Sequence, residues 1–409
     1  MLKRIHTEQL RLGMHVHELC GSWMDHPFWR NAFPLEDPED LQAILTTGIK
    51  EAWIDTDKGL DVEGGEAEET ISAEVESVLA QADTAGMREQ RIDTAQEAAR
   101  AVMVCAKSKL AVTSMFREAR MGKALNAEDA LPVVEEISSS VLRNPGALIG
   151  LARLKNKDEY TYMHSVAVCA LMVSLARQLE LDEDQVRQAG IAGLLHDVGK
   201  MVIPTEVLNK PGKLTDVEFE LMKSHPAEGH KILLEGSGVS DVALDVCLHH
   251  HEKVNGSGYP DKLRGEQISL YAKMGAVCDV YDAITSNRPY KNGWEPAESI
   301  RKMAEWSAGH FDAAVFHAFV KSIGIYPVGS LVRLESNRLA VIVDQTTKSL
   351  LTPVVKVFFS IKSNGRIVPE LLDLSKPACR DKIVSHEDPE VWKIPDIHEL
   401  WSGLPAKSW

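Results

Sequence analysis

Histidine and aspartate side chains recur between residues 164 and 279, and each lies in or beside an apolar stretch with helical spacing. His164 precedes the segment SVAVCALMVSLA, and the segment IAGLL precedes the pair His196-Asp197. Helical bundles build metal sites in their cores from polar side chains on the inner faces of packed helices. The candidate ligands, in chain order, are His164, His196, Asp197, His225, the triplet His249-His250-His251, and Asp279.

A metal centre explains these side chains better than a series of unrelated core residues. A single buried histidine is more often a hydrogen-bonded core residue than a ligand. Burying five or more histidines together with two aspartates costs several kcal/mol for each group unless a cation or hydrogen bonds compensate it. Imidazole and carboxylate without thiolate suit Fe, Mn, Co or Zn better than a structural zinc site. Because adjacent side chains can diverge, Asp197 can bridge two ions while His196 binds one, which predicts a di-metal site.

Two further segments could bind a phosphodiester beside such a centre. The segment NGSGYP, residues 255–260, follows the histidine triplet, and its two glycines allow the backbone to approach a ligand closely. Downstream, the segment NRPYK contains Arg288 and Lys291. A guanidinium and an ammonium held near a metal site match the charge of a phosphate diester. Each segment also has a plainer interpretation, the first as an ordinary turn and the second as a solvated surface pair.

The composition limits the class of protein. The chain has 409 residues, with 45 Lys and Arg against 60 Asp and Glu and a net charge of −15, which argues against binding DNA, RNA or acidic membranes. Six scattered cysteines without a CxxC pair indicate reduced thiols. The apolar run at 165–176 is too short to cross a bilayer, and the N-terminus lacks the apolar segment of a signal peptide. We therefore expect a cytoplasmic protein without membrane insertion.

The sequence pattern predicts a mainly α protein with β structure near each end. Residues 51–55 predict a strand, and two amphipathic helices are expected on either side of Gly122. The segments SLVRLES, LAVIVDQ and VVKVFFS alternate in the manner of an antiparallel meander. The predicted parts are a small α/β domain at 1–60, an acidic linker with a polar helix at 61–92, a helical connector at 93–145, an all-helical metal-site bundle at 146–325, a β subdomain at 326–376, and a polar tail at 377–409 with Trp392, Trp401 and Trp409 as docking points.

Four segments in order resemble the signature blocks of the HD-GYP phosphodiesterases, a branch of the HD metal-hydrolase superfamily that acts on cyclic di-GMP. They are LLHDVGKMVIPTEVLNKPGKLT, KSHPAEGHKIL, HHHEKVNGSGYPDKLRGEQIS and AVCDVYDAITSNRPYK. The resemblance extends from residue 158 to residue 319 with no block missing. Nearer the N-terminus, LRLGMHVHEL, PFWRNAF and EAWIDTDKG resemble a small domain of unknown function often found ahead of HD-GYP domains. The resemblance implies an HD-type helical bundle.

The resemblance also implies a role for individual residues. His249 would be an extra residue that binds no metal, because the family's histidine pair directly precedes a glutamate, here Glu252. Lys200 matches the family lysine beside the metals and joins Asp197 as a catalytic candidate. The implied substrate contacts are Tyr259, Pro260, Arg288 and Lys291, and the implied metal ligands are His164, His196, Asp197, His225, His250, His251 and Asp279.

Two positions depart from the family pattern. Some members have a glutamate four residues before the first histidine and bind a third metal. That position is Tyr160 here, and Glu159 lies about 100° away around a helix. We therefore expect two divalent ions, with Fe or Mn favoured. Asn255 replaces an acidic residue that is common before GSGYP, without removing a ligand.

The activity implied by the resemblance is hydrolysis of cyclic di-GMP to linear pGpG, with GMP as the product of a second cut. Two ions bridged by Asp197 would lower the pKa of bound water, and Lys200 with the two downstream cations would stabilise phosphoryl charge. Two alternatives stay open, namely a catalytically weak cyclic di-GMP receptor and an HD phosphohydrolase acting on another nucleotide. A regulatory protein partner and a homodimer are also left open. Four N-terminal histidines could form a second metal site, although surface or strand positions are favoured: His6, His15, His17 and His26.

Overall fold

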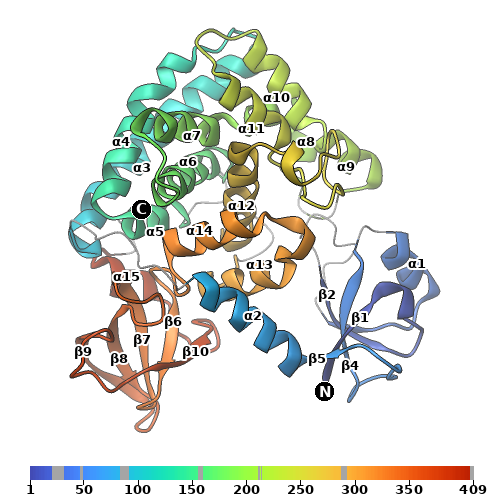
Figure 1. Cartoon of the computed structure of the whole chain (residues 1–409), viewed down its shortest axis with the longest axis vertical. Helices are drawn as coiled ribbons and strands as arrows, with labels where there is room; N and C mark the ends of the chain where they lie inside the picture. Colours follow the sequence, from blue (N-terminus) through green and yellow to red (C-terminus); the bar gives the residue numbers. More distant parts are fainter. Residues whose placement is uncertain are drawn as a thin grey trace.

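A helical bundle forms most of the molecule, and each end of the chain contributes a small β-sheet (Figure 1). In Figure 1 the two sheets lie below the bundle on opposite sides of the view. The mainly α class with flanking β structure is therefore confirmed. The computed structural model describes residues 1–20, 32–46, 49–82, 92–154, 160–210, 212, 214–286 and 293–405.

The N-terminal sheet is antiparallel and has its own small hydrophobic core. Its strand order is β3-β2-β4-β1-β5, which places the predicted strand Glu51–Asp55 at the centre. The helix of this domain begins at Pro38, where the missing N–H of proline costs no hydrogen bond. The elements are β1 (Leu2–His6), β2 (His15–Cys20), β3 (Phe33–Pro34), α1 (Pro38–Thr46), β4 (Glu51–Asp55) and β5 (Glu66–Ala67).

The bundle is built around a helix that is apolar on all sides. This helix, Tyr160–Gln178, packs against helices before and after it in the chain, and residues 163–176 are buried. A helix that is hydrophobic all round belongs in a protein core. The helices of this part of the molecule are α3 (Thr94–Arg120), α4 (Leu131–Arg143), α5 (Pro145–Ala152), α6 (Tyr160–Gln178) itself, α7 (Glu183–Leu195), α8 (Thr205–Leu208), α9 (Asp216–Met222), α10 (His225–Leu234), α11 (Asp241–His249), α12 (Leu270–Thr285), α13 (Pro296–His310) and α14 (Ala313–Ile323). Helix α6 contacts α3, α4, α5, α7, α12 and α14.

The expected break near Gly122 is present. Helix α3 begins after Asp93, whose side chain accepts a hydrogen bond from the backbone N–H of Gln96. It ends at Arg120, and Gly122 has a φ of +74°, a conformation that glycine adopts without strain. Helix α4 then packs beside α3 against α6 and α7.

Helix α2 (Glu68–Ala82) shows that the acidic segment is not solvated on all sides. Ile71, Val75, Leu79 and Ala82 are buried, and α2 contacts α13 and α14. Their spacing places these side chains on one helix face. The sequence indicated a polar helix because the segment is acidic and contains no Lys or Arg. Its narrow apolar stripe nevertheless joins the N-terminal sheet to the bundle.

The C-terminal sheet is larger than the predicted meander. Strands β6, β7 and β8 are antiparallel as expected, and two further strands extend the sheet to the order β10-β6-β7-β8-β9. Pro369 lies within the edge strand β9, where a missing N–H breaks no pairing toward the interior of the sheet. The strands are β6 (Leu331–Leu334), β7 (Arg338–Asp344), β8 (Val354–Ser360), β9 (Gly365–Asp373) and β10 (Ile383–Glu387).

Residues 377–405 are folded, which corrects the expectation of a polar tail. Strand β10 pairs with β6, and His386 lies 2.7 Å from Glu298 of α13. Helix α15 (Ile397–Ser402) brings Trp401 into the main core, where it is 1% exposed. The polar composition of this segment concealed both elements, because a short strand is held by its pairing and by single ion pairs rather than by its own apolar face. Trp409 lies outside the described residues.

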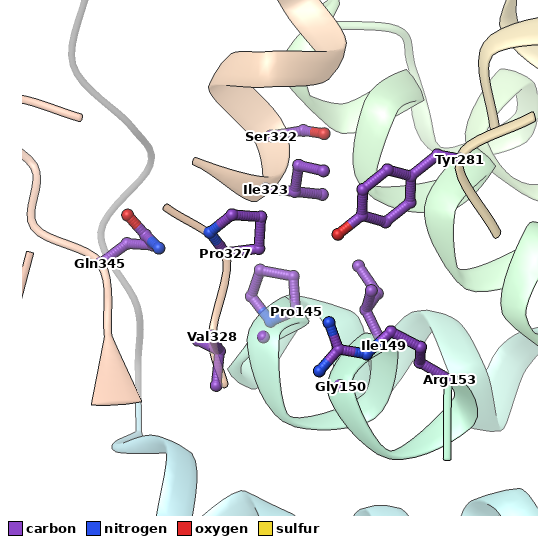
Figure 2. Close-up of a pocket in the computed structure, with 11 residues that line it drawn as sticks. Pro145, Ile149, Gly150, Arg153, Tyr281, Ser322, Ile323, Pro327, Val328 and Gln345 are labelled. Carbon is purple, nitrogen blue, oxygen red and sulfur yellow. The ribbon is translucent and has the colours of Figure 1, made fainter. Parts of the chain in front are cut away.

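A pocket lies where the bundle meets the C-terminal sheet (Figure 2). Its volume is about 390 Å³, including space that is open to solvent. Helices α5, α12 and α14 line it together with Pro327, Val328 and Gln345. In Figure 2 the Arg153 guanidinium and the Tyr281 hydroxyl lie on the same side of the pocket. Most of its wall is apolar, so the pocket belongs to the packing between these two parts. None of the described helices is long and apolar enough to cross a membrane.

One buried ion pair joins α3 to α4 beside the central helix and can be tested directly. Glu97 is fully buried and accepts hydrogen bonds of 2.7 Å from Arg143 and from Ser140. Glu97→Ala is expected to lower the free energy of unfolding by about 2 kcal/mol, because it leaves a partly buried guanidinium without its partner. Chemical unfolding followed by circular dichroism measures this change.

A neighbouring ion pair supplies the matched control for that variant. Glu136 of α4 pairs with Lys107 of α3 at 3.2 Å, and both side chains are exposed. Glu136→Ala is expected to change the free energy of unfolding by about 0.5 kcal/mol or less. Equal effects of the two substitutions would contradict a structural role for the buried pair.

Candidate metal centre

The predicted ligands come from five separate parts of the bundle and meet in its interior. His164 lies in the second turn of α6, and Asp279 lies within α12. The pair His196-Asp197 ends α7, just before a 3₁₀ helix at Val198–Val202. His225 is the first residue of α10, while the remaining pair directly follows α11. All seven side chains are buried: His164, His196, Asp197, His225, His250, His251 and Asp279.

The Asp197 carboxylate lies between two groups of histidines. Its Oδ2 is 3.3 Å from Nε2 of His164 and 3.4 Å from Nε2 of His196. Its Oδ1 is 3.2 Å from Nε2 of His225 and 3.9 Å from Nε2 of His250. One oxygen therefore faces each group, which is the arrangement expected of a carboxylate that bridges two ions.

Asp279 completes the first of these groups. Its Oδ1 lies 2.9 Å from Nε2 of His164 and 3.8 Å from Nε2 of His196. Its other oxygen is 3.8 Å from Nδ1 of His251. The ligand atoms of His164, His196 and Asp279 all lie within 4.8 Å of one another, as a shared ion would require.

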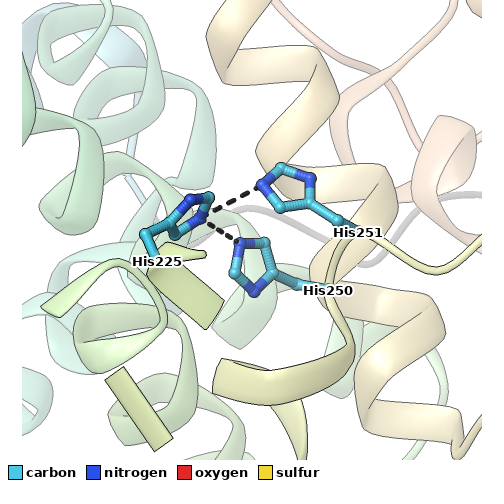
Figure 3. Close-up of side chains that lie close together, drawn as sticks. All are labelled: His225, His250 and His251. Carbon is cyan, nitrogen blue, oxygen red and sulfur yellow. Dashed lines mark hydrogen bonds between the residues drawn. The ribbon is translucent and has the colours of Figure 1, made fainter. Parts of the chain in front are cut away.

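The second group consists of three histidines whose rings converge (Figure 3). Nε2 of His225 lies 3.4 Å from Nε2 of His250 and 3.2 Å from Nε2 of His251. Figure 3 shows the three rings directed at one another, with His225 on α10 and the consecutive His250 and His251 on the segment after α11. Two neutral imidazole nitrogens cannot both accept a hydrogen bond from each other, so a proton or a cation must lie among them.

Backbone carbonyls orient these rings from behind. Nδ1 of His196 donates to the carbonyl of Gly193 at 2.8 Å, and Nδ1 of His225 donates to the carbonyl of Met222 at 2.8 Å. Nδ1 of His250 is 3.0 Å from the carbonyl of Val246. Because a carbonyl only accepts, Nδ1 carries the proton in each case and the Nε2 lone pair is directed at the centre. This is the tautomer that a metal ligand needs.

Two buried atoms at the centre favour a cation. Among the described residues, Nε2 of His196 and Oδ1 of Asp197 have no hydrogen-bond partner. A buried polar atom without a partner costs about 1–3 kcal/mol. Both atoms are ligand atoms of the two groups, so metal ions would satisfy them. The residues present therefore fit a metal centre made from imidazole and carboxylate.

The protonation of the site agrees with this charge distribution. Burial raises the pKa of Asp197, but the neighbouring Lys200 and His196 outweigh it and hold the pKa well below its usual range. Burial lowers the pKa of His164, yet its carboxylate neighbours raise the pKa to about 9. Burial and the nearby His196 lower the pKa of His250 to about 3. The Asp197 carboxylate is thus ionised, and His250 is neutral and ready to bind a metal.

Lys200 lies where the resemblance suggested, beside the centre. Its ammonium donates to Oδ2 of Asp197, the oxygen that faces the first group. Because the lysine remains partly exposed, its charge can reach both the carboxylate and a ligand entering from solvent. Arg288 and Lys291 lie outside the described residues.

The loop with the sequence GYP covers the second histidine group. The ring of Tyr259 stacks on the ring of His251, with centroids 4.8 Å apart and an interplanar angle of 26°. A side chain at Gly258 would meet backbone atoms of residues 251–253, so only glycine allows this close approach. Asn255 accepts hydrogen bonds from the backbone and hydroxyl of Ser257, which fixes the turn before the tyrosine. Pro260 follows the tyrosine directly.

Two side chains near the centre were not anticipated from the sequence. Oδ2 of Asp282 lies 2.6 Å from Nδ1 of His164 and so orients that ring. The other histidine of the first group, His196, is oriented by a backbone carbonyl instead. Its spacing of three from Asp279, on the same face of α12, was the signal available. The ammonium of Lys223 lies 5.8 Å from the Tyr259 ring centroid, within the range of a cation–π contact.

The N-terminal histidines do not form a comparable group. His6 and His15 lie in or at the end of strands of the N-terminal sheet, as does His17. Among the described residues, the clusters able to hold a metal contain only residues of the bundle. His26 lies outside the described residues.

Comparisons with known proteins agree with this fold. The HD domain profile matches residues 144–315, and a profile described as a domain of unknown function (DUF3391) matches residues 2–130. With the full-length relative described next, these matches show that the chain belongs to the HD-GYP phosphodiesterase family, with an N-terminal domain of unknown function. The chain is 56% identical over its full length to the cyclic di-GMP phosphodiesterase PA4108 of Pseudomonas aeruginosa, covering 97% of that protein.

Two further relatives are similar over part of the chain. The cyclic di-GMP phosphodiesterase response regulator RpfG of Xanthomonas campestris is 51% identical over 29% of this chain and 32% of that protein. The 3′3′-cGAMP-specific phosphodiesterase 1 of Vibrio cholerae is 35% identical over 41% of this chain and 38% of that protein. Both similarities cover less than half of the chain, so they bear on that part alone.

The hydrogen bond from His164 to Asp282 gives a testable prediction. Asp282→Asn keeps the side-chain volume but removes the charge behind His164, which should lower metal affinity about tenfold. Competition with a chelator, followed by metal analysis of the protein, measures this affinity.

Asp184→Asn on the exposed surface of α7 is the matched control, since Asp184 pairs only with Arg187 and Gln188 in the described contacts. It should leave metal affinity unchanged. An Asp282→Asn protein with the affinity of the unaltered chain would show that the charge behind His164 is unimportant.

Proposed function

We propose that this protein is a metal-dependent phosphodiesterase that hydrolyses cyclic di-GMP to linear pGpG, with GMP as the product of a second cut. The observation that carries the proposal is the Asp197 carboxylate, which directs one oxygen at each of two buried ligand groups. Similarity over the full length to a cyclic di-GMP phosphodiesterase supports this substrate. The intact ligand set favours an enzyme over a receptor that has lost catalysis.

The proposed cofactors are two divalent ions, with Fe or Mn favoured by imidazole and carboxylate ligands. When bound, such ions lower the pKa of a water molecule toward neutrality and offset negative charge on the phosphate. Asp197 would be shared by both ions through its two oxygens. The first ion would be held by His164, His196 and Asp279, and the second by His225, His250 and His251.

Cationic and aromatic side chains around this centre would receive the substrate. Lys200 would offset charge that develops on the phosphoryl oxygens, because its ammonium already lies against Asp197. The exposed edge of the Tyr259 ring would meet a guanine or a phosphate, with Pro260 beside it. Arg288 and Lys291 are proposed as phosphate contacts on the basis of the family resemblance.

The division into domains is also a proposal. Residues 146–325 would form the catalytic part, and residues 1–60 a domain that the linker at 61–92 and the connector at 93–145 join to it. The β subdomain proposed at 326–376 would be extended by the strand and helix of 377–405. A cytoplasmic location is proposed from the scattered cysteines, which indicate reduced thiols. A regulatory protein partner and a homodimer stay open.

Turnover of cyclic di-GMP by the full chain tests the proposed function. We expect the anaerobically purified protein, supplied with Fe(II) or Mn(II), to open the ring while containing about two ions per chain. Asp197→Ala should lose both metal and activity, since it removes the shared ligand. Chromatography of the products and metal analysis of the same sample measure both quantities.

Full metal occupancy without turnover of cyclic di-GMP would contradict the proposal. The mixed dinucleotide 3′3′-cGAMP is the comparison substrate, because a relative of similar sequence acts on it. Faster cleavage of 3′3′-cGAMP than of cyclic di-GMP would support the proposed reaction but replace the proposed substrate. Retention of both metal and activity by Asp197→Ala would exclude the bridging role.

The position of Lys223 predicts a contribution to substrate binding. Its ammonium lies near the Tyr259 ring and also pairs with the exposed Glu220 at 2.6 Å, so it can turn toward an anion at the site. Lys223→Gln should raise KM about threefold to tenfold with little change in kcat, because one charged contact is lost. Steady-state kinetics on cyclic di-GMP measures both constants.

Lys231→Gln is the matched control, since Lys231 lies on the exposed surface of α10 and pairs with Glu228 at 2.7 Å. Its KM should equal that of the unaltered protein. If the two variants gave the same kinetics, Lys223 would have no part in binding the substrate.

A further inference from the structure

We propose that Glu252 and His249 are positioning residues that hold Asp261, and through it the Tyr259 ring, over the second histidine group. We call the three residues Glu252, His249 and Asp261 the loop anchor. This inference deepens the proposed function and rests on it for the identity of the substrate. The loop anchor itself is argued from contacts that do not depend on that identity.

Glu252 forms the first half of the loop anchor. It directly follows His251, is 2% exposed, and uses both carboxylate oxygens on the backbone of the loop. Oε1 accepts a hydrogen bond of 2.7 Å from the N–H of Asp261, and Oε2 accepts one of 3.1 Å from the N–H of Leu263. A buried carboxylate must be compensated, and here the compensation comes from the segment that carries the tyrosine.

His249 forms the second half and holds the side chain of the same residue. Its Nε2 lies 3.1 Å from Oδ2 of Asp261, and its Nδ1 lies 2.7 Å from Oδ1 of Asp245. Both partners are carboxylates, so both ring nitrogens donate. Nδ1 of His249 is therefore fixed by Asp245 of the same helix, and its Nε2 binds the loop through Asp261.

The loop anchor also reaches the helix that supplies Asp279. The second oxygen of Asp245 accepts a hydrogen bond from the hydroxyl of Ser269. Ser269 precedes α12, and its hydroxyl accepts a hydrogen bond of 3.1 Å from the N–H of Ala272, which caps that helix. One set of polar contacts thus joins the end of α11, the loop and the start of α12.

The Tyr259 ring depends on these contacts for its place. Its own backbone N–H makes a hydrogen bond of 3.3 Å to the carbonyl of His251, longer than the 2.7 Å bond that holds Asp261. Tyr259 and Pro260 immediately precede Asp261. Fixing Asp261 therefore limits how far the tyrosine ring can move from His251, and a ring already in place costs the substrate less on binding.

The structural alternative is that these contacts only stabilise the fold. Substitutions that remove them would then lower the free energy of unfolding without changing the affinity for substrate. His249 and Glu252 directly flank the predicted ligands His250 and His251 in the sequence. A substitution that disturbs the metal centre is therefore a second alternative. The test must therefore separate loop order, metal content and KM.

Two substitutions disrupt different halves of the loop anchor. Glu252→Gln replaces one acceptor oxygen by an amide group that cannot accept, and Asp261→Ala removes the side chain that His249 holds. Asp261 is mostly exposed, so its variant should fold even if the buried substitution does not. Asp381→Asn is the matched control: Asp381 likewise accepts from a backbone N–H, that of Ser336 at 3.0 Å, within the C-terminal sheet.

Amide hydrogen exchange of the metal-loaded protein, without substrate, tests the loop anchor whatever the enzyme's substrate. Exchange of a peptide covering residues 259–263 should be faster in Glu252→Gln and Asp261→Ala than in the unaltered chain, and unchanged in Asp381→Asn. Metal content should stay the same in all three variants. Unchanged exchange in both anchor variants, or loss of metal from Asp261→Ala, would overturn the proposal.

Kinetics on cyclic di-GMP tests the consequence for binding. KM should rise about tenfold in Glu252→Gln and about threefold in Asp261→Ala, with kcat changed less. In a chain that already carries Tyr259→Ala, adding Glu252→Gln should raise KM little further, because the anchor acts through that ring. Fully additive effects, or an unchanged KM in both variants, would overturn the positioning role. Absence of turnover in the unaltered chain would instead refute the proposed function. The hydrogen-exchange result would then show by itself whether the loop anchor holds the loop.

Discussion

The placement of the Asp197 carboxylate between two histidine groups is the constraint on which the rest of the structure depends. Its oxygens face opposite groups, with His164 on one side and His225 on the other. Such a set of buried charges and lone pairs is unfavourable without a cation. The bundle accommodates it because each ligand lies at a helix end or on an inner face, with backbone carbonyls free to orient the rings.

The same principle extends outward from the ligands. Carbonyls of the preceding turn orient His196 and His225, whereas Asp282 orients His164 from a neighbouring helix. Beyond these contacts, the GYP loop is held by polar groups of α11 and α12, the helices that also supply ligands. The position of the loop and the positions of His250, His251 and Asp279 therefore depend on how these two helices pack.

The candidate metal ligands could be chosen from the sequence more completely than the residues that orient them. His164 and Asp279 could be identified because a polar residue in an apolar helical stretch is costly without a role, and the ordered family blocks placed the others. Asp282 could not be chosen among the carboxylates near it without knowing which face of α12 meets His164. In the fold, β7 alternates clearly and was predicted, whereas β10 has a polar sequence and is held by pairing with β6. Long-range pairing of this kind leaves little trace in local composition.

Crystals grown anaerobically with Mn(II) allow the most direct test of the central claim, through anomalous scattering from the bound ions. The account predicts two peaks on opposite sides of Asp197, one within reach of His164 and Asp279 and the other within reach of His225 and His251, each bound by a different oxygen of the carboxylate. A single peak, or two ions that Asp197 does not bridge, would contradict it.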